Sequence, residues 1–389
     1  MRAIARSLLT AMAVALPLAA RAATPAPASI PWAQLPTDYH PAPETDEGGL
    51  WMMGDRAEKQ IRSSPLLVKD PALNAYMHKI VCRLAGPYCA SIRIYVLDIP
   101  YFEAAMSPNG MLQVWTGFLL RARNEAQISF VLGHEISHYL LRHTISQYRH
   151  LRDQAGAVAV LGALTGGLGN LAGLGLRGSA NAFSREEERE ADARGFELAT
   201  GAGYDPAQSV ELWQEELDEE TVAPKDKEFE VFAASHPATA ERLATLAAMA
   251  KDKSSERAHW DVGAESYDAV LRPFRLQWLD ENLALADFDQ SLALVQTLIK
   301  DEPHSGELQY ALGEIYRRRN ADGDSAKALA AYSAALSAGG APSETYRGLG
   351  LTSMKAGDKT AARIALQKYL AAAPASNDRA MIEFYLSQL

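Results

Sequence analysis

The spacing of apolar residues changes from helical to strand-like between residues 73 and 117. Residues 73–84 carry apolar side chains at helical spacing, which predicts a helix. Residues 91–99 (SIRIYVLDI) alternate apolar and polar side chains, and residues 111–117 (MLQVWTG) follow the turn sequence SPNG. Both segments are therefore predicted to be strands. We expect a folded part that begins near Leu50 and is mainly α-helical with a small β-sheet.

Two later segments carry the signals of helix starts. Asn124 is followed three residues later by Gln127, and apolar residues then recur at helical spacing, which predicts an amphipathic helix. Ser184 and Glu187 have the same spacing, so a second helix is predicted from Arg185 onward.

From about residue 260 the chain is rich in Ala and Leu, with a period close to that of the tetratricopeptide repeat. Residues 258–389 are therefore predicted to form an all-α solenoid of such repeats, with a concave surface suited to peptides or proteins. An ordinary helical bundle is the alternative. The residues that match the repeat positions are Leu292, Val295, Leu298 and Pro303, then Leu312, Gly313, Tyr316, Ala328 and Tyr332, then Tyr346, Leu349, Gly350, Ala362, Leu366 and Pro374.

The N-terminal residues have the order of a cleavable secretory signal peptide. Arg2 and Arg6 precede an apolar run that ends in small residues, which predicts a signal peptide over residues 1–22. A retained membrane anchor is the alternative, but the run is short for a bilayer span. The Pro-rich residues 23–49 are predicted to be an extended linker. We expect a periplasmic protein, with secretion as the alternative.

Charge and cysteine content narrow the choice of partners and compartment. The formal net charge of -10 argues against nucleic acid as a partner. The only two cysteines, Cys82 and Cys89, flank a Gly-Pro turn and would meet an oxidising compartment after export. A disulfide between them would stabilise the fold by roughly 2 to 3 kcal/mol. Two buried thiols are the alternative.

Residues 155–176 are uncharged and dense in glycine. Their length approaches that of a bilayer span, so a membrane-inserting hairpin is one reading. Each glycine disfavours a helix by roughly 1 kcal/mol, and a Gly-Gly pair and Asn170 interrupt the run. We favour a loop that packs over the functional site, without membrane contact.

The sequence GHEISH, residues 133–138, carries the first candidate chemistry. His134 and His138 share one helical face and can place two imidazoles on one zinc ion, with Glu135 beside them toward a bound water. A peptidase site also needs a third protein ligand and an open fourth position. Glu188 and Asp192 share a face of the second helix and are candidates, although a solvated acidic face is the alternative.

Three motifs together resemble a known family. HEISH, SREEEREAD (residues 184–192) and SHPATAER (residues 235–242) resemble, in this order, the motifs of zinc metallopeptidases of the HtpX and CAAX prenyl protease type. The resemblance covers residues 50–250 and implies a zincin-like α+β domain with one Zn²⁺ per chain. It implies that His134, His138 and Glu188 are the ligands and that Glu135 is the catalytic base.

The resemblance also implies supporting residues. Asp192 would support a ligand, and Arg242 would bind a substrate carbonyl or pair with Asp192. His236 would stabilise the oxyanion, or would occupy the open zinc position and inhibit. The family often has Asn-Ala where this chain has Glu103-Ala104, which is expected to add negative charge near the substrate. Gly133 is expected to leave room for substrate.

These features predict an exported zinc-dependent endopeptidase that cleaves unfolded or misassembled envelope proteins in quality control. The substrate is expected to add as a strand along Gln113–Trp115. The repeats would present clients or dock to an envelope protein complex. The alternative is a periplasmic chaperone or scaffold with a latent peptidase domain. A purely structural zinc site is disfavoured, because it would leave Glu135 without a task.

Overall fold

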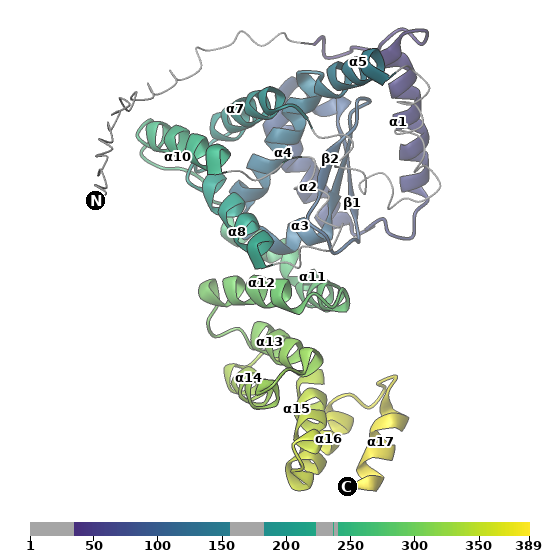
Figure 1. Cartoon of the computed structure of the whole chain (residues 1–389), viewed down its shortest axis with the longest axis vertical. Helices are drawn as coiled ribbons and strands as arrows, with labels where there is room; N and C mark the ends of the chain where they lie inside the picture. Colours follow the sequence, from purple (N-terminus) through teal and green to yellow (C-terminus); the bar gives the residue numbers. More distant parts are fainter. Residues whose placement is uncertain (1–34, 156–182, 223–235, 237–239) are drawn as a thin grey trace, which may run out of the picture. The chain divides into compact units, whose positions relative to one another are not determined.

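The computed structural model describes residues 35–155, 183–222, 236 and 240–389 (Figure 1). The predicted signal peptide, the linker as far as residue 34 and the glycine-rich stretch from residue 156 onward lie outside these residues. The described part is mostly helical with one small sheet, which confirms the coarse fold class. No helix in it is long and apolar enough to span a bilayer.

Three strands form the sheet: β1 (Arg93–Leu97), β2 (Ala104–Met106) and β3 (Met111–Trp115). The order is β1-β3-β2, with β1 parallel and β2 antiparallel to β3. Both predicted strands are confirmed as β1 and β3. β2 was not predicted, because three residues are too few to show an alternating pattern.

The expected substrate edge along Gln113–Trp115 is wrong. These residues belong to β3, which is the central strand, so its backbone groups already pair with β1 and β2. β2 is an edge strand of this sheet instead.

Helix α4 (Glu125–Leu140) lies between the sheet and α7 (Arg185–Gly201) (Figure 1). Every residue of α4 is buried, so the expectation of an amphipathic helix is wrong. The reason is that other elements cover the remaining faces of α4, above all α2 (Pro71–Ala85) and α8 (Gln208–Val222). The other helices of this part are α1 (Asp46–Arg62), η1 (Gly86–Ser91), α3 (Thr116–Arg121), α5 (His143–Ala155) and α10 (Ala240–Ser254).

The folded part begins before Leu50, inside the segment predicted as linker. Helix α1 begins at Asp46, where the Thr45 side chain accepts a hydrogen bond from the Gly48 N–H. Upstream of this cap, the Tyr39 hydroxyl donates to Glu47 at 2.8 Å. The proline content of the segment therefore did not prevent an ordered start, because polar side chains fix it to the helix.

Seven further helices follow: α11 (Ala264–Ala284), α12 (Phe288–Asp301), α13 (Gly306–Arg319), α14 (Asp324–Ala338), α15 (Glu344–Lys355), α16 (Lys359–Ala372) and α17 (Arg379–Gln388). α13 packs on α14, and α15 packs on α16 (Figure 1). Two glycines that match repeat positions lie at these contacts: a Cβ on Gly313 would meet the ring of Tyr332, and a Cβ on Gly350 would meet Leu366. The helix pairs are thus consistent with stacked repeats, which stay a prediction.

Cys82 at the end of α2 and Cys89 in η1 form a disulfide, with 4.6 Å between their Cα atoms. The predicted bond is confirmed. It joins η1 to the end of α2, directly before β1.

Candidate active site

Helix α4 carries the first three side chains of the site. It begins as predicted, with the Asn124 side chain accepting from the Gln127 N–H at 2.8 Å. In a full capping box the Gln127 side chain would accept a hydrogen bond from the Asn124 N–H. Here it accepts from the Arg123 N–H, one residue earlier. His134, Glu135 and His138 lie further along this buried helix.

Helix α7 lies against α4 at very short range. A Cβ on Gly133 would lie 2.8 Å from the Gly195 carbonyl oxygen, and a Cβ on Gly195 would lie 2.6 Å from the His134 nitrogen. Gly133 therefore permits contact between two helix backbones, and the expectation that it leaves room for substrate is wrong. The α7 start is confirmed, because Ser184 and Glu187 form both bonds of the capping box.

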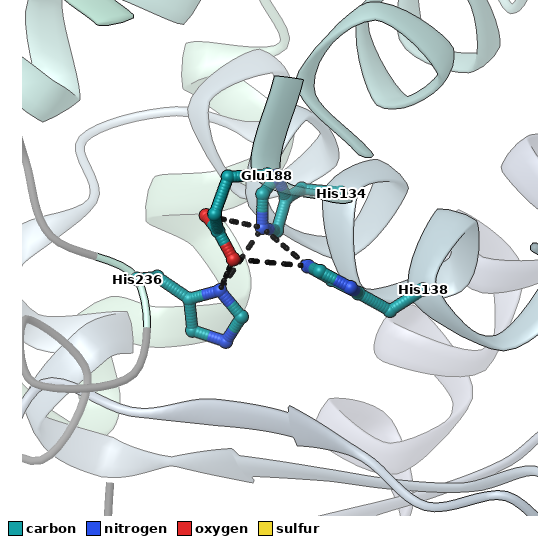
Figure 2. Close-up of side chains that lie close together, drawn as sticks. All are labelled: His134, His138, Glu188 and His236. Carbon is teal, nitrogen blue, oxygen red and sulfur yellow. Dashed lines mark hydrogen bonds and ion pairs between the residues drawn. The ribbon is translucent and has the colours of Figure 1, made fainter. Parts of the chain in front are cut away.

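Four donor groups converge where α4 faces α7 (Figure 2). The Nε2 atoms of His134 and His138 lie 3.0 Å apart, and Glu188 Oε1 lies 3.5 Å from His138 Nε2. His236 Nδ1 lies 2.8 Å from Glu188 Oε1 and 3.2 Å from His134 Nε2. All four side chains are buried, and one donor atom of each lies within 4.8 Å of the others.

This donor set fits a zinc ion, for which imidazole nitrogen and carboxylate oxygen are common ligands. Glu188 Oε1 is the carboxylate oxygen that faces His138 and His236, while the buried Oε2 makes no hydrogen bond and lies 3.3 Å from Arg242 Nη1. Burial raises the pKa of Glu188, but its interactions with His236, His138 and His134 together lower the pKa below its usual value. Burial also holds the pKa of His138 well below its usual value. Both shifts favour the ligand forms, a carboxylate and a neutral imidazole.

The family of this part of the chain follows from its match over residues 66–250 to the model of peptidase family M48. These residues form a peptidase family M48 domain. The match confirms the family resemblance that the three motifs indicate, and M48 metallopeptidases use zinc.

Relatives support this assignment. The chain is 26% identical over 214 residues to the beta-barrel assembly-enhancing protease of Escherichia coli (strain K12), which covers 51% of this chain and 43% of that protein. It is 32% identical over 175 residues to the mitochondrial metalloendopeptidase OMA1 of Bos taurus, covering 40% and 33%. The chain thus spans less than half of the length of either relative.

Asp192 and Arg242 form a hydrogen-bonded pair that contacts His134 in the M48 domain. Asp192 Oδ1 lies 2.9 Å from His134 Nδ1, the ring nitrogen that faces away from the other donors. Arg242 donates to both oxygens of Asp192, at 2.7 and 2.8 Å. Of the two roles left open for Arg242, the structure has the pairing with Asp192. Burial raises the pKa of Asp192, but the charges and hydrogen bonds of Arg242 and His134 together outweigh this, so the pKa is lowered.

Glu135 lies beside the four donors without joining them. Its Oε2 accepts a hydrogen bond from the Met106 N–H of β2 at 3.1 Å, while its buried Oε1 makes no hydrogen bond. Burial raises its pKa above the ordinary value of 4.5, against the opposing effect of His236 and His134. A carboxylate with a raised pKa beside a group of possible metal ligands suits a general base.

Glu103, directly before β2, does not add the negative charge that the sequence predicted. Its side chain is 2% exposed, and Oε2 has no hydrogen-bond partner. Burial, with the nearby charge of Glu135, raises its pKa well above 4.5. The protonated form is therefore favoured, because an unpaired buried carboxylate is costly.

We expect Glu103→Gln to stabilise the fold increasingly as the pH rises. The folded state binds the Glu103 proton more tightly than the unfolded chain does, so the native protein loses stability as the pH rises from 4.5 toward the raised pKa. Gln does not titrate. The difference in Tm between variant and native protein should widen between about pH 5 and about pH 8, in favour of the variant.

Thermal unfolding across this pH range measures the difference. Exposed Glu44, for which the same change should leave a small and constant difference, is the control. A pH-independent difference for Glu103→Gln would show that its carboxyl does not change charge in this range.

Sequence reasoning missed the neighbours of His138. Phe183 stacks on the His138 ring, with 4.0 Å between ring centroids. His143 Nδ1 lies 2.9 Å from His138 Nδ1, and His143 Nε2 lies 3.2 Å from Glu190 Oε2. The sequence does show a third histidine, His143, close after His138. An offset of five residues does not place two side chains on one helical face, so this histidine was not connected to the site.

Proposed function

We propose that this chain is a zinc-dependent endopeptidase. The observation that carries the proposal is the convergence of two histidines of α4 and a glutamate of α7 on one buried point, with Glu135 beside them. Cleavage of an unfolded protein such as casein by the zinc-loaded protein, and its loss in the Glu135→Gln variant, tests this function.

In the proposed mechanism, His134, His138 and Glu188 hold the metal. When bound, zinc would polarise the scissile carbonyl and activate a water molecule. Glu135 takes a proton from the attacking water and returns it to the leaving amine, a role that requires proximity to the metal and no bond to it. Asp192 and Arg242 hold His134 in the orientation that keeps Nε2 toward the ligands.

The substrate is proposed to add as a strand at the edge of β2. Met106 at the end of this edge strand donates its N–H to Glu135, so β2 is joined directly to the proposed base. Strand addition uses main-chain hydrogen bonds and needs an extended segment, which favours unfolded or misassembled proteins as substrates.

We further propose that the protein acts in the periplasm, in quality control of envelope proteins. The predicted signal peptide and the Cys82–Cys89 disulfide support an exported protein, because disulfides persist in oxidising compartments. The match to a relative named beta-barrel assembly-enhancing protease supports an envelope role. The helices from α11 onward would serve as repeats that present clients or dock to an envelope complex.

A second candidate function is a chaperone or scaffold with a largely latent peptidase domain. His236 motivates it, because its Nδ1 lies among the donors of the three proposed ligands. A catalytic zinc site keeps one position open, whereas a fourth protein ligand would fill it. In this second candidate function, His236 would close the site as the fourth ligand.

His236→Ala is accordingly expected to raise the rate of casein cleavage several-fold, because it would open the fourth position. Initial rates at equal zinc content measure the effect. Exposed His259, changed to Ala, is the control. Loss of cleavage in His236→Ala would instead support a role in stabilising the oxyanion, and would contradict the inhibitory role.

A further inference from the structure

His143 lies directly behind the proposed ligand His138. It is the first residue of α5 and is 3% exposed. The preceding residue, Arg142, has φ 60, a left-handed conformation that is uncommon outside glycine. Glu47 of α1 holds the Arg142 side chain in an ion pair. This break between α4 and α5 places the His143 ring against the ring of His138.

Two hydrogen bonds connect His138 to a carboxylate through His143. His138 Nδ1 and His143 Nδ1 lie 2.9 Å apart, and His143 Nε2 lies 3.2 Å from Glu190 Oε2. Glu190 belongs to α7, two residues beyond the proposed ligand Glu188. Phe183 stacks on the face of the His138 ring and limits its rotation.

A zinc site at this cluster allows one placement of the protons. The Nε2 atom of His138 faces the other donors, so it must be free of hydrogen to bind a cation. His138 Nδ1 then carries the hydrogen and donates it to His143 Nδ1. The remaining hydrogen of neutral His143 is on Nε2, where it is donated to the Glu190 carboxylate.

The reverse placement would disable the ligand. If His143 Nδ1 carried the hydrogen and donated it to His138 Nδ1, neutral His138 would carry its own hydrogen on Nε2. That hydrogen would point into the cluster of donors. Because Glu190 accepts from His143 Nε2, the arrangement favours the competent tautomer of His138.

We infer that His143 and Glu190 are positioning residues for the metal ligand His138, an inference that rests on the proposed zinc site. They fix the tautomer and orientation of His138 as Asp192 does for His134, with one imidazole inserted between ligand and carboxylate. α7 therefore supplies one ligand and the carboxylates that support both histidine ligands.

Two substitutions of His143 separate its hydrogen bonds from its packing. His143→Leu fills the buried space but removes the acceptor for His138. His143→Asn retains an acceptor oxygen near the position of Nδ1. Loss of such a supporting partner weakens metal binding by about 10- to 100-fold. We expect that loss in His143→Leu, and an affinity within about threefold of the native value in His143→Asn, because the hydrogen bond to the ligand is retained.

The experiment measures the zinc dissociation constant by competition with a chelator of known affinity. All proteins carry Glu135→Gln, so that the readout is independent of cleavage, and unfolding of the zinc-free proteins is followed in parallel. Glu190→Gln should weaken zinc binding by up to about tenfold, because the carboxylate charge is lost and an acceptor oxygen is kept. The control is Glu197→Gln, on the exposed side of α7.

Native zinc affinity in His143→Leu would overturn the inference. Equal weakening in folded His143→Leu and His143→Asn would also overturn it, because packing rather than the hydrogen bond would then be responsible. Should His143→Leu not fold, the affinities of His143→Asn and Glu190→Gln decide. Absence of zinc binding with His143 and Glu190 intact would instead refute the proposed zinc site, and with it this inference.

Discussion

Replacing Glu135 with Gln is expected to leave zinc bound while cleavage falls by about 10²- to 10⁴-fold, the usual contribution of general acid–base catalysis. Gln has nearly the same shape and keeps an acceptor for the Met106 N–H, so the link to β2 should persist. It cannot accept a proton from water. Because Glu135 does not belong to the converging donor set, metal content should be unchanged.

Zinc per chain and the initial rate of casein cleavage measure the two effects on the same preparation. Glu186→Gln is the matched control, because this residue is an exposed glutamate of α7 and should change neither quantity. Unaltered cleavage in Glu135→Gln would exclude Glu135 as the base. Loss of zinc together with cleavage would instead make Glu135 a metal ligand.

Replacing Glu188 with Ala is expected to remove zinc as well as cleavage. Glu188 supplies the carboxylate among the three proposed ligands, and its Oε1 lies 2.8 Å from His236 and 3.5 Å from His138. Loss of a residue that supports a ligand weakens metal binding by about 10- to 100-fold. Loss of the ligand Glu188 itself should weaken zinc binding by more than this. Cleavage should fall to the background rate at equimolar zinc.

Metal content after dialysis against a weak chelator, together with cleavage, measures this result. Glu186→Ala is the control on the same helix, and thermal unfolding establishes that the variant is folded. Native zinc content in a folded Glu188→Ala variant would contradict the ligand assignment. The two substitutions thus separate the roles, since Glu135→Gln should lose cleavage alone and Glu188→Ala should lose both.

Local signals predicted much of the framework. The helix predicted at residues 73–84 is α2, and the predicted strands are β1 and β3. The helix starts at Asn124 and Ser184 were found because the hydrogen bonds of a cap join residues three positions apart. The start of α1 was missed because it depends on the contact of Tyr39 with Glu47. The strand β2 was missed because it depends on pairing with β3.

The sequence by itself determined that His134 and His138 share a helical face and that Glu188 and Asp192 share another, because residues four apart meet in any α-helix. It also determined the order of motifs that places residues 66–250 in peptidase family M48. Only the tertiary structure decided which partner each residue has. Asp192 contacts His134 and Arg242, Glu103 is buried, and His143 joins His138 to Glu190. The contacts of Asp192 and His143 join the helices α4, α5, α7 and α10. No local sequence pattern predicts contacts between separate helices, because these contacts depend on how closely the helices pack.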